Sequence, residues 1–116
     1  MASSYKILGQ LDLTSATLTD LYTVPSGTET VISTIVIANR ASSADTFRLA
    51  MREDGDAISD KHYLAYDVPV AANDSTTLTL GVAMEATDVL SVAAAGTASE
   101  LSINAFGAEV TVSGGN

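Results

Sequence analysis

The stretch KHYLAYDVP, from Lys61 to Pro69, gathers the side chains of this chain that are best suited to acid–base chemistry. It contains the only histidine, His62, together with two of the four tyrosines and Asp67. A histidine serves as a general base only when a nucleophile or an orienting carboxylate lies within hydrogen-bond reach. Because successive side chains of a strand point to opposite faces, a regular strand separates His62 from Asp67. We therefore interpret the stretch as one wall of a sheet rather than as a catalytic site.

The same alternation predicts which side chains of this stretch are buried. The face expected to pack in the core consists of His62, Leu64, Tyr66 and Val68. The other face is expected to be a surface stripe and consists of Lys61, Tyr63, Ala65 and Asp67. Tyr63 would give this stripe a large, flat contact area at low entropic cost, which is typical of residues in protein interfaces.

No other motif in the sequence supports catalysis or cofactor binding. There is no Gly-x-Ser-x-Gly elbow, no His-Glu-x-x-His pair, no cysteine and no glycine-rich phosphate loop. One histidine without cysteine is too few for the usual zinc and iron ligand sets. We expect no enzyme activity, no cofactor and no zinc or iron site. A small enzyme whose groups meet from distant loops is kept as a third hypothesis, after two structural ones.

A cluster of carboxylates lies in the segment 53–60, EDGDAISD. Glu53, Asp54, Asp56 and Asp60 supply hard oxygen atoms of the kind that calcium prefers. The spacing departs from the EF-hand loop, because Gly55 comes too early and no bidentate acid follows at the required position. A solvated hairpin whose charges discourage strand pairing is the favoured interpretation, and calcium binding at this loop stays an open alternative.

The chain is strongly acidic, with 14 Asp and Glu residues against 5 Lys and Arg residues and a formal net charge of −9. Such a surface repels phosphate backbones and anionic lipids, so we expect neither nucleic acid nor a membrane as partner. The few basic residues include Arg40, Arg48 and Arg52. We expect them to pair with carboxylates, either within a subunit or across an interface. Without a signal-peptide core near its start, the chain is expected to be soluble and made in the cytoplasm.

The dominant hydrophobic period is two, which is typical of half-buried β-strands. In the segment TFRLAMRE, the apolar Phe47, Leu49 and Met51 alternate with Arg48, Ala50 and Arg52. Turn residues such as Gly27, Gly55, Asn73 and Gly96 separate the apolar segments. The pattern predicts strands over residues 5–9, 19–24, 30–38, 46–53, 62–68, 75–82, 88–94 and 100–106.

These segments predict one all-β domain over residues 1–116, an antiparallel β-sandwich or jelly-roll-like barrel of about eight short strands. We expect residues 1–13 to form an assembly arm and residues 111–116 to form a mobile C-terminal tail. The segment 30–38 has apolar side chains on both faces, so it is expected to be central or to face a partner. The predicted core consists of Val31, Ile35, Ile37, Phe47, Leu49, Met51, Leu64, Leu78, Leu80, Val89, Leu101 and Ile103.

Five segments between Leu21 and Val110 are similar to a known class of proteins. They are LYTVPSGTETVISTIVIANR, TFRLAMRE, DKHYLAYDVPVAANDSTTLTLG, TDVLSV and INAFGAEV. Together they resemble small virion structural proteins of tailed bacteriophages, including cyanophages. The resemblance implies a particle component that is located in the virion and made in the host cytoplasm. It carries over no functional residue, because the matching pattern marks the core and the turns.

Two structural hypotheses follow from the resemblance and from the missing catalytic motifs. The first is a capsid decoration (cement) protein, working as a homo-oligomer such as a trimer and binding the major capsid protein or another virion protein. The second is a tail, neck, baseplate or fibre accessory module for host attachment, in which Tyr5, Tyr22 or Tyr63 would stack on a carbohydrate. The predicted contact surface consists of Tyr5, Ile7, Leu8, Arg48, Arg52 and Tyr63.

Overall fold

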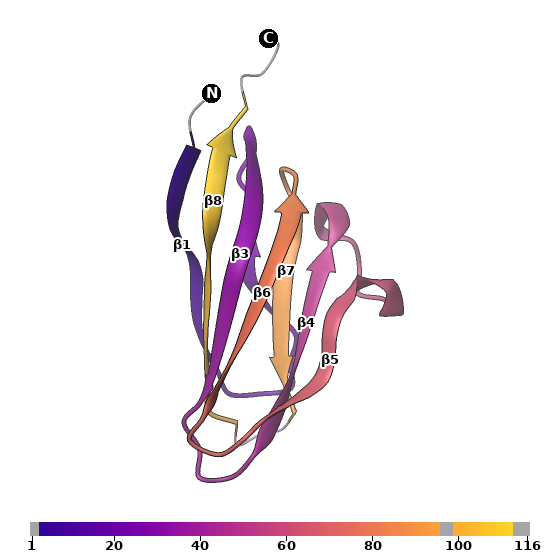
Figure 1. Cartoon of the computed structure of the whole chain (residues 1–116). Helices are drawn as coiled ribbons and strands as arrows, with labels where there is room; N and C mark the ends of the chain where they lie inside the picture. Colours follow the sequence, from indigo (N-terminus) through magenta and orange to yellow (C-terminus); the bar gives the residue numbers. More distant parts are fainter. Residues whose placement is uncertain (1–2, 96–98, 113–116) are drawn as a thin grey trace.

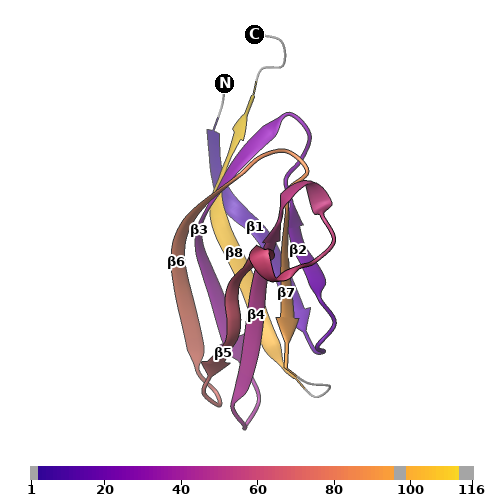
Figure 2. The same ribbon diagram turned by 90° about the vertical axis from the view of Figure 1, so that its right-hand side faces the viewer.

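Two four-stranded antiparallel sheets pack against each other (Figure 1). The computed structural model describes residues 3–95 and 99–112. Sheet A has the order β1 (Ser3–Leu13), β8 (Leu101–Thr111), β3 (Thr28–Asn39) and β6 (Ser75–Met84). Sheet B has the order β2 (Thr19–Thr23), β7 (Val89–Ala94), β4 (Asp45–Arg52) and β5 (Tyr63–Val70). Two helical turns, η1 (Glu53–Gly55) and η2 (Asp60–His62), connect β4 to β5 on one side of the sandwich (Figure 2).

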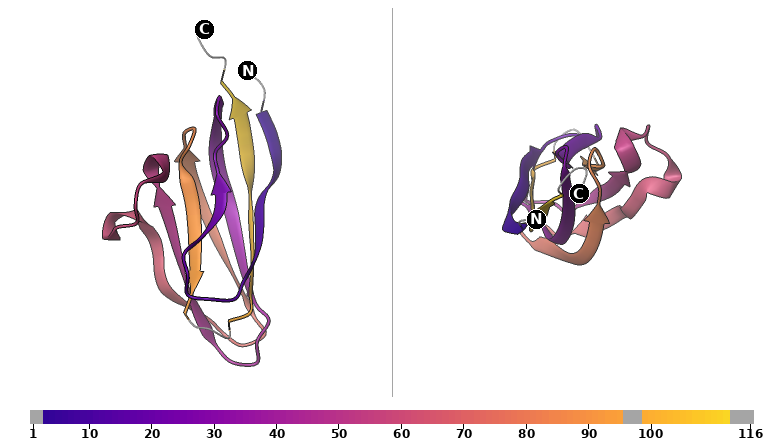
Figure 3. Two further views of the ribbon diagram at one scale, coloured as in Figure 1. Left: turned by 180° about the vertical axis from the view of Figure 1, so that it is seen from behind. Right: turned by 90° about the horizontal axis from the view of Figure 1, so that it is seen from above.

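The strands pair in the jelly-roll scheme. Strand β1 pairs with β8, β2 with β7, β3 with β6 and β4 with β5, as in one long hairpin folded over itself. The additional pairs β3–β8 and β4–β7 join the hairpin into two sheets. The view from above shows the resulting layers end-on (Figure 3). The predicted all-β sandwich with jelly-roll-like topology is therefore confirmed.

Each predicted segment overlaps one observed strand. For six of the eight, the predicted and observed ends differ by at most two residues. The exceptions are β1 and β8, which were predicted over residues 5–9 and 100–106 and are longer. They extend because they pair with each other from Ser3 and Val110 to Leu13 and Leu101. The predicted central position of the 30–38 segment is confirmed, since β3 lies between β8 and β6.

The segment predicted to be an assembly arm is an edge strand of the chain's own sheet over the described residues 3–13. Its use in assembly stays a prediction. At the other end, Thr111 of the predicted tail belongs to β8. The backbone N–H of Val112 donates to the Gly27 carbonyl oxygen at 2.8 Å. The remainder of the predicted tail, residues 113–116, lies outside the described residues, as does the turn prediction at Gly96.

The core fills the space between the two sheets. Its buried members include six predicted residues, Ile35, Ile37, Phe47, Leu49, Leu101 and Ile103. Val89 is also buried, but it lies outside this cluster. Met51 and Leu78 are partly buried and pack against this cluster. The prediction was wrong for Val31, Leu64 and Leu80, whose side chains are exposed. No helix in the described part of the chain is long and apolar enough to cross a membrane.

Bulges explain the wrong positions in sheet A, because an extra residue moves the following side chains to the opposite face. In β3 the register shifts between Ile32 and Thr34, so Ile32 is buried and Val31 points outward. Opposite this shift, Leu80 and Gly81 form the bulge of β6, and Gly81 has a φ of +86°. Leu80 is exposed at this point.

Strand β5 carries two register shifts against β4, and they reverse the predicted faces of Leu64, Ala65 and Tyr66. The pairs are Phe47 with Val68, Leu49 with Ala65, and Ala50 with Tyr63. The backbone is left-handed at Asp67, with a φ of 53°. As a consequence Ala65 and Val68 pack against the core, whereas Leu64 and Tyr66, predicted to be buried, are exposed. Only His62 and Val68 of the predicted core face point inward.

Candidate interaction surface

The outward side chains of sheet A form rows across its four strands. The register aligns Tyr5 of β1 with Ala108 of β8, Val31 of β3 and Ala83 of β6. The next two rows consist of Ile7, Phe106, Thr34 and Thr79, and of Gln10, Asn104, Val36 and Thr77. Their neighbours along the strands, such as Ile35, Ile103 and Ala105, point into the core. We call the outward positions of these three rows the A face.

The A face is apolar and open where β1 begins. Tyr5 is 88% exposed, Ile7 is 54% exposed and Val31 is 42% exposed. Phe106 and Ala108 lie between them on β8 and are half-buried. A shallow hollow at the β3–β6 side of the face is lined by Glu29, Thr30, Val31, Ala83, Met84, Glu85 and Val110. Solvent therefore reaches large apolar side chains from three adjacent strands.

No position of the A face carries a charge. The nearest charges are Glu29 and Glu85, which line the hollow beside Val31 and Ala83, and Asp12, one row beyond Gln10. Asp12 forms an ion pair with Arg40. Charged residues are depleted at the centres of protein interfaces, whereas aromatic residues are enriched there. In a chain with 14 acidic residues, this neutral surface has the composition of a protein contact.

Two glycines allow the close backbone packing beneath the A face. A Cβ on Gly107 would collide with the carbonyl oxygen of Val31, and one on Gly9 would lie 2.5 Å from the carbonyl oxygen of Leu21. At the same level, the Ser33 hydroxyl donates to the Phe106 carbonyl oxygen at 3.1 Å. These contacts fix the bulges, and with them the point at which Val31 turns outward.

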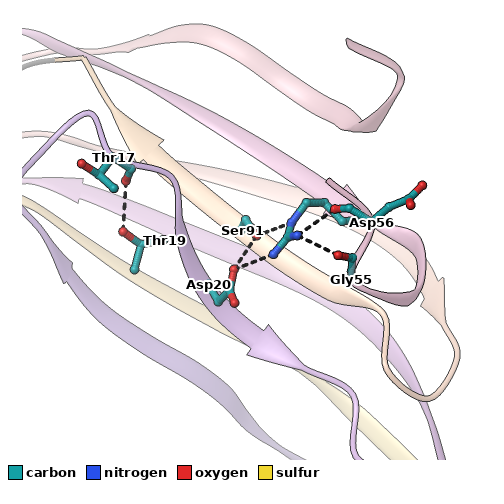
Figure 4. A network of polar contacts seen from close by, with 7 residues as sticks. Thr17, Thr19, Asp20, Gly55, Asp56 and Ser91 are labelled. Carbon is teal, nitrogen blue, oxygen red and sulfur yellow. Dashed lines mark hydrogen bonds and ion pairs between the residues drawn. The ribbon is translucent and has the colours of Figure 1, made fainter. Parts of the chain in front are cut away.

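The outward face of sheet B differs, because the chain's own side chains close it. Ala50, Ser91 and Ala93 alternate with core residues and point away from the core, yet all three are buried. The Arg52 guanidinium donates to Asp20 Oδ1 at 2.8 Å, to Ser91 Oγ at 3.3 Å, and to the carbonyl oxygens of Gly55 and Asp56 at 3.1 and 2.7 Å (Figure 4). Arg52 thereby ties β4 to β2, β7 and η1.

Arg48 lies in the middle of β4 and also pairs within the chain. Its Nε and Nη2 donate to Asp67 Oδ1 and Oδ2 at 2.7 and 3.3 Å. The guanidinium stacks 3.9 Å from the centre of the Tyr66 ring, and Tyr66 meets Tyr63 edge-on with ring centres 4.9 Å apart. The hydrogen bonds from Arg48 lower the pKa of the Asp67 carboxyl below its ordinary value. Arg40, Arg48 and Arg52 all pair with carboxylates inside the subunit, which is one of the two predicted alternatives.

A polar cluster joins the two sheets at the end where β1 begins. The Tyr22 hydroxyl lies 2.7 Å from Thr30 Oγ1 and donates to Glu109 Oε2 at 2.5 Å. Glu109 Oε1 also accepts from Lys6 Nζ at 2.5 Å. Burial, and then the bond to Glu109, raises the pKa of Tyr22 to about 12. The hydrogen bonds from Lys6, and then from Tyr22, lower the pKa of the Glu109 carboxyl.

His62 is buried at the end of η2, close to a hydroxyl and a carboxylate. Its Nδ1 accepts the Ser59 backbone N–H at 3.0 Å and lies 3.5 Å from Ser59 Oγ. Its Nε2 lies 3.8 Å from Asp56 Oδ2 and has no hydrogen-bond partner among the described residues. Because the Nδ1 lone pair is already bound by a backbone N–H, it is not free to take the Ser59 proton. The arrangement closes the η2 turn. As predicted, Asp67 does not pair with His62, since it bonds Arg48.

The acidic segment 53–60 is organised by hydrogen bonds to a carboxylate from another loop. Asp88 Oδ1 accepts the Asp54 N–H and Asp88 Oδ2 accepts the Glu85 N–H, both at 2.9 Å. Asp54 Oδ1 accepts the Thr87 hydroxyl at 2.5 Å. No group of three or more acidic or histidine side chains in residues 3–95 and 99–112 is placed to hold a metal ion. These carboxylates brace the turns, and both interpretations of the segment, the hairpin and the calcium site, stay predictions.

The structure divides the predicted contact residues between two surfaces. Tyr5 and Ile7 lie together on the A face, whereas Leu8 turns inward and packs against the core. Arg48 and Tyr63 lie on sheet B, with Arg52 further along the same strand. The sequence interpretation missed the other exposed members of the A face, Val31 and Ala83, and their neighbours Phe106 and Ala108. The neutral run INAFGA was the available signal, because it lacks the alternating polar residues of a solvated strand.

Comparison with known proteins gives a fold match and no sequence family. No protein-family model matches the chain, and no curated protein matches it in sequence. A solved structure of a Bacillus endospore appendage protein, described as belonging to a novel family of disulfide-linked pili, superposes with a TM-score of 0.59 and 11% identity. That match covers 97% of this chain and 88% of the other. A chain of infectious bursal disease virus, Gx strain, matches with a TM-score of 0.43 and 13% identity, over 100% of this chain and 34% of the viral one.

Proposed function

We propose that this protein is a non-enzymatic structural component of a virion, and more specifically a capsid decoration (cement) protein on the outer surface of the head. The observation that carries the proposal is the A face. It is a broad, neutral, partly aromatic sheet surface on an otherwise acidic molecule, and such a surface is suited to protein contact rather than to solvent.

The fold supports the same proposal. Jelly rolls occur in viral capsid domains and in lectins, although fold alone does not assign function. The Bacillus protein that shares the fold belongs to a family of disulfide-linked pili. The disulfide links of those pili have no counterpart here, because the chain has no cysteine. Assembly of this chain therefore depends on noncovalent surfaces.

The direct test is to purify particles of the virus that encodes the chain and to label them with a gold-coupled antibody against it. We expect gold on the heads, and we expect heads from a virus lacking the gene to release their nucleic acid at a lower temperature than wild-type heads. Absence of the chain from purified particles would overturn the proposal. Gold confined to tails would assign the chain to the second function below.

The second candidate is a tail, neck, baseplate or fibre module that binds a host carbohydrate. It is favoured by one observation, a shallow site at the edge of sheet B lined by Asp60, Tyr63 and Tyr66. An exposed tyrosine ring beside a carboxylate can stack on a sugar and accept hydrogen bonds from its hydroxyls. Of the other predicted tyrosines, Tyr22 is engaged between the sheets and Tyr5 lies on the A face. Glycan-array binding that Tyr66→Ala abolishes, while Tyr5→Ala leaves it intact, would support this function.

A further inference from the structure

We propose that the occupant of the A face is a second copy of this chain, so that two molecules stack their A faces in a twofold-symmetric pair. This inference rests on the proposed function, because it names the partner of the surface that carries it. The pair should form from the isolated protein, before any contact with a particle.

The chemistry of the A face favours a second copy. A partner chosen by charge would be basic, because the chain has a formal net charge of −9, but the three rows of the A face carry no charge and glutamates lie only at their border, at Glu29 and Glu85. Its central rows present Tyr5, Ile7, Val31 and Ala83, with threonines on β3 and β6. The matching surface must be neutral and apolar, and the A face of another copy meets this requirement without burying an unpaired charge.

Contact through the A faces also limits the repulsion between two acidic molecules. The ion pairs of Asp20 and Asp67 and the acidic segment 53–60 all lie on sheet B or on the turns attached to it. Stacking the A faces places both B sheets on the outside of a four-layer pair. Because stacked sheets lie about 10 Å apart, the two B sheets would be separated by roughly 30 Å, beyond the Debye length of about 8 Å at physiological salt. This orientation keeps most carboxylates of the two copies apart.

The size and shape of the A face suit a weak pair. Its three rows cover four strands about 4.8 Å apart and about six residues of each strand, which outlines roughly 400 Å² in projection. Because a standard interface buries about 800 Å² per partner, we expect a dimer that forms only at high protein concentration. Stacked sheets commonly align at about −30°, and a twofold pair uses the same surface on both molecules, so it closes without leaving a second A face exposed.

The test is sedimentation equilibrium of the purified chain and of single variants that place a carboxylate on the A face. At high protein concentration, we expect a dimer for the wild type, and a monomer for both Val31→Glu and Tyr5→Glu. Tyr5 is 88% exposed, so Tyr5→Glu removes no core contact and folding is not at risk. The matched control is Ile58→Glu, because Ile58 is as exposed as Val31, at 42%, but lies outside the A face. This variant should remain dimeric. Raising the sodium chloride concentration should leave the wild-type dimer intact or tighten it.

Three results would overturn the inference: a wild-type monomer at high protein concentration, a dimer that persists in both carboxylate variants, or a trimer. None of them decides the proposed function, which depends on whether the chain is present in the particle. Conversely, a dimer with these variant effects in a chain that is absent from particles would leave the inference standing and remove the virion assignment.

Discussion

The Tyr22 hydroxyl donates a hydrogen bond to the Glu109 carboxylate across the gap between the sheets, with 2.5 Å between Oη and Oε2. Tyr22 belongs to β2 of sheet B and Glu109 to β8 of sheet A. Thr30 and Lys6 complete the contact from β3 and β1. Four strands therefore meet in one polar cluster at the end of the sandwich where Tyr5 is exposed. The cluster holds the inner side of the strands whose outer side forms the A face.

Removing the Tyr22 hydroxyl should lower stability. In Tyr22→Phe the ring remains, while Thr30 and Glu109 each lose a partner in a part-buried site. A lost hydrogen bond that leaves its partners unsatisfied costs about 1–3 kcal/mol. We expect the urea midpoint to fall accordingly at neutral pH. Tyr5→Phe is the matched control, because its hydroxyl lies on an exposed ring; an equal loss in both variants would contradict the role of the cluster.

The stability of the wild type should also fall at high pH because of Tyr22. Its pKa is raised from 10.0 to about 12 in the folded state. The unfolded chain therefore loses this proton at a lower pH than the folded chain does. The contribution of Tyr22 is complete below pH 10 and is lost as the pH rises toward 12. Urea unfolding between pH 9 and pH 12 should show a decline that is smaller in Tyr22→Phe.

Glu109 should give the opposite dependence in acid. Its pKa is lowered from the ordinary 4.5 by Lys6 and then by Tyr22, so the folded state favours the carboxylate. This contribution is present above pH 4.5 and is lost as the pH falls through the lowered folded-state pKa. Replacing Glu109 by Gln should flatten the acid branch of the stability curve. An acid branch as steep in Glu109→Gln as in the wild type would contradict this role of Glu109.

Gly107 should tolerate no side chain. In Gly107→Ala the new Cβ would collide with the Val31 carbonyl oxygen, and β3 or β8 would have to move. Overpacking of this kind typically costs about 1–3 kcal/mol. Gly81→Ala is the comparison, since its Cβ would meet nothing within 4 Å and only the left-handed φ of +86° is strained. Chemical denaturation should rank Gly107→Ala as the less stable variant, and the reverse order would contradict the close packing.

His62 should prove to be structural. Replacing it with Gln removes a buried ring and disturbs the acceptor of the Ser59 N–H, so we expect a lower melting temperature. The hydroxyl of Ser59 should not react with a fluorophosphonate probe in the wild type, because the Nδ1 lone pair of His62 is already occupied. Covalent labelling of Ser59, lost in the His62 variant, would instead support an enzyme.

The alternation of apolar and polar residues predicted the strands of this fold well. The predicted burial of side chains was wrong at the bulges, where this alternation is interrupted. The pattern of Ile35 and Ile37 correctly placed both side chains in the core, but extending it to Val31 crossed the bulge at Ser33. The sequence VISTIV gives no local sign of this extra residue, because the bulge depends on pairing with β8. In β6, Gly81 was a weak sign, since an isolated glycine within a strand often marks a bulge.

The candidate surface was predicted in part for a related reason. Tyr5 and Ile7 alternate outward on an isolated edge segment, so their exposure could be anticipated from the sequence. Val31, Ala83 and Phe106 join them only through the register of β3, β6 and β8, which brings together residues far apart in the chain. Arg48 and Arg52 looked equally available, but their acidic partners Asp67 and Asp20 come from β5 and β2. The sequence alone did not indicate which carboxylate each arginine pairs with.

The most direct measurement is an electron cryomicroscopy reconstruction of the intact particle with this protein located in it. The account predicts that the chain lies on the head and that density of a neighbouring subunit covers Tyr5, Ile7 and Val31. A reconstruction in which these side chains face solvent, while the subunit is held through sheet B or the η1–η2 turns, would contradict it.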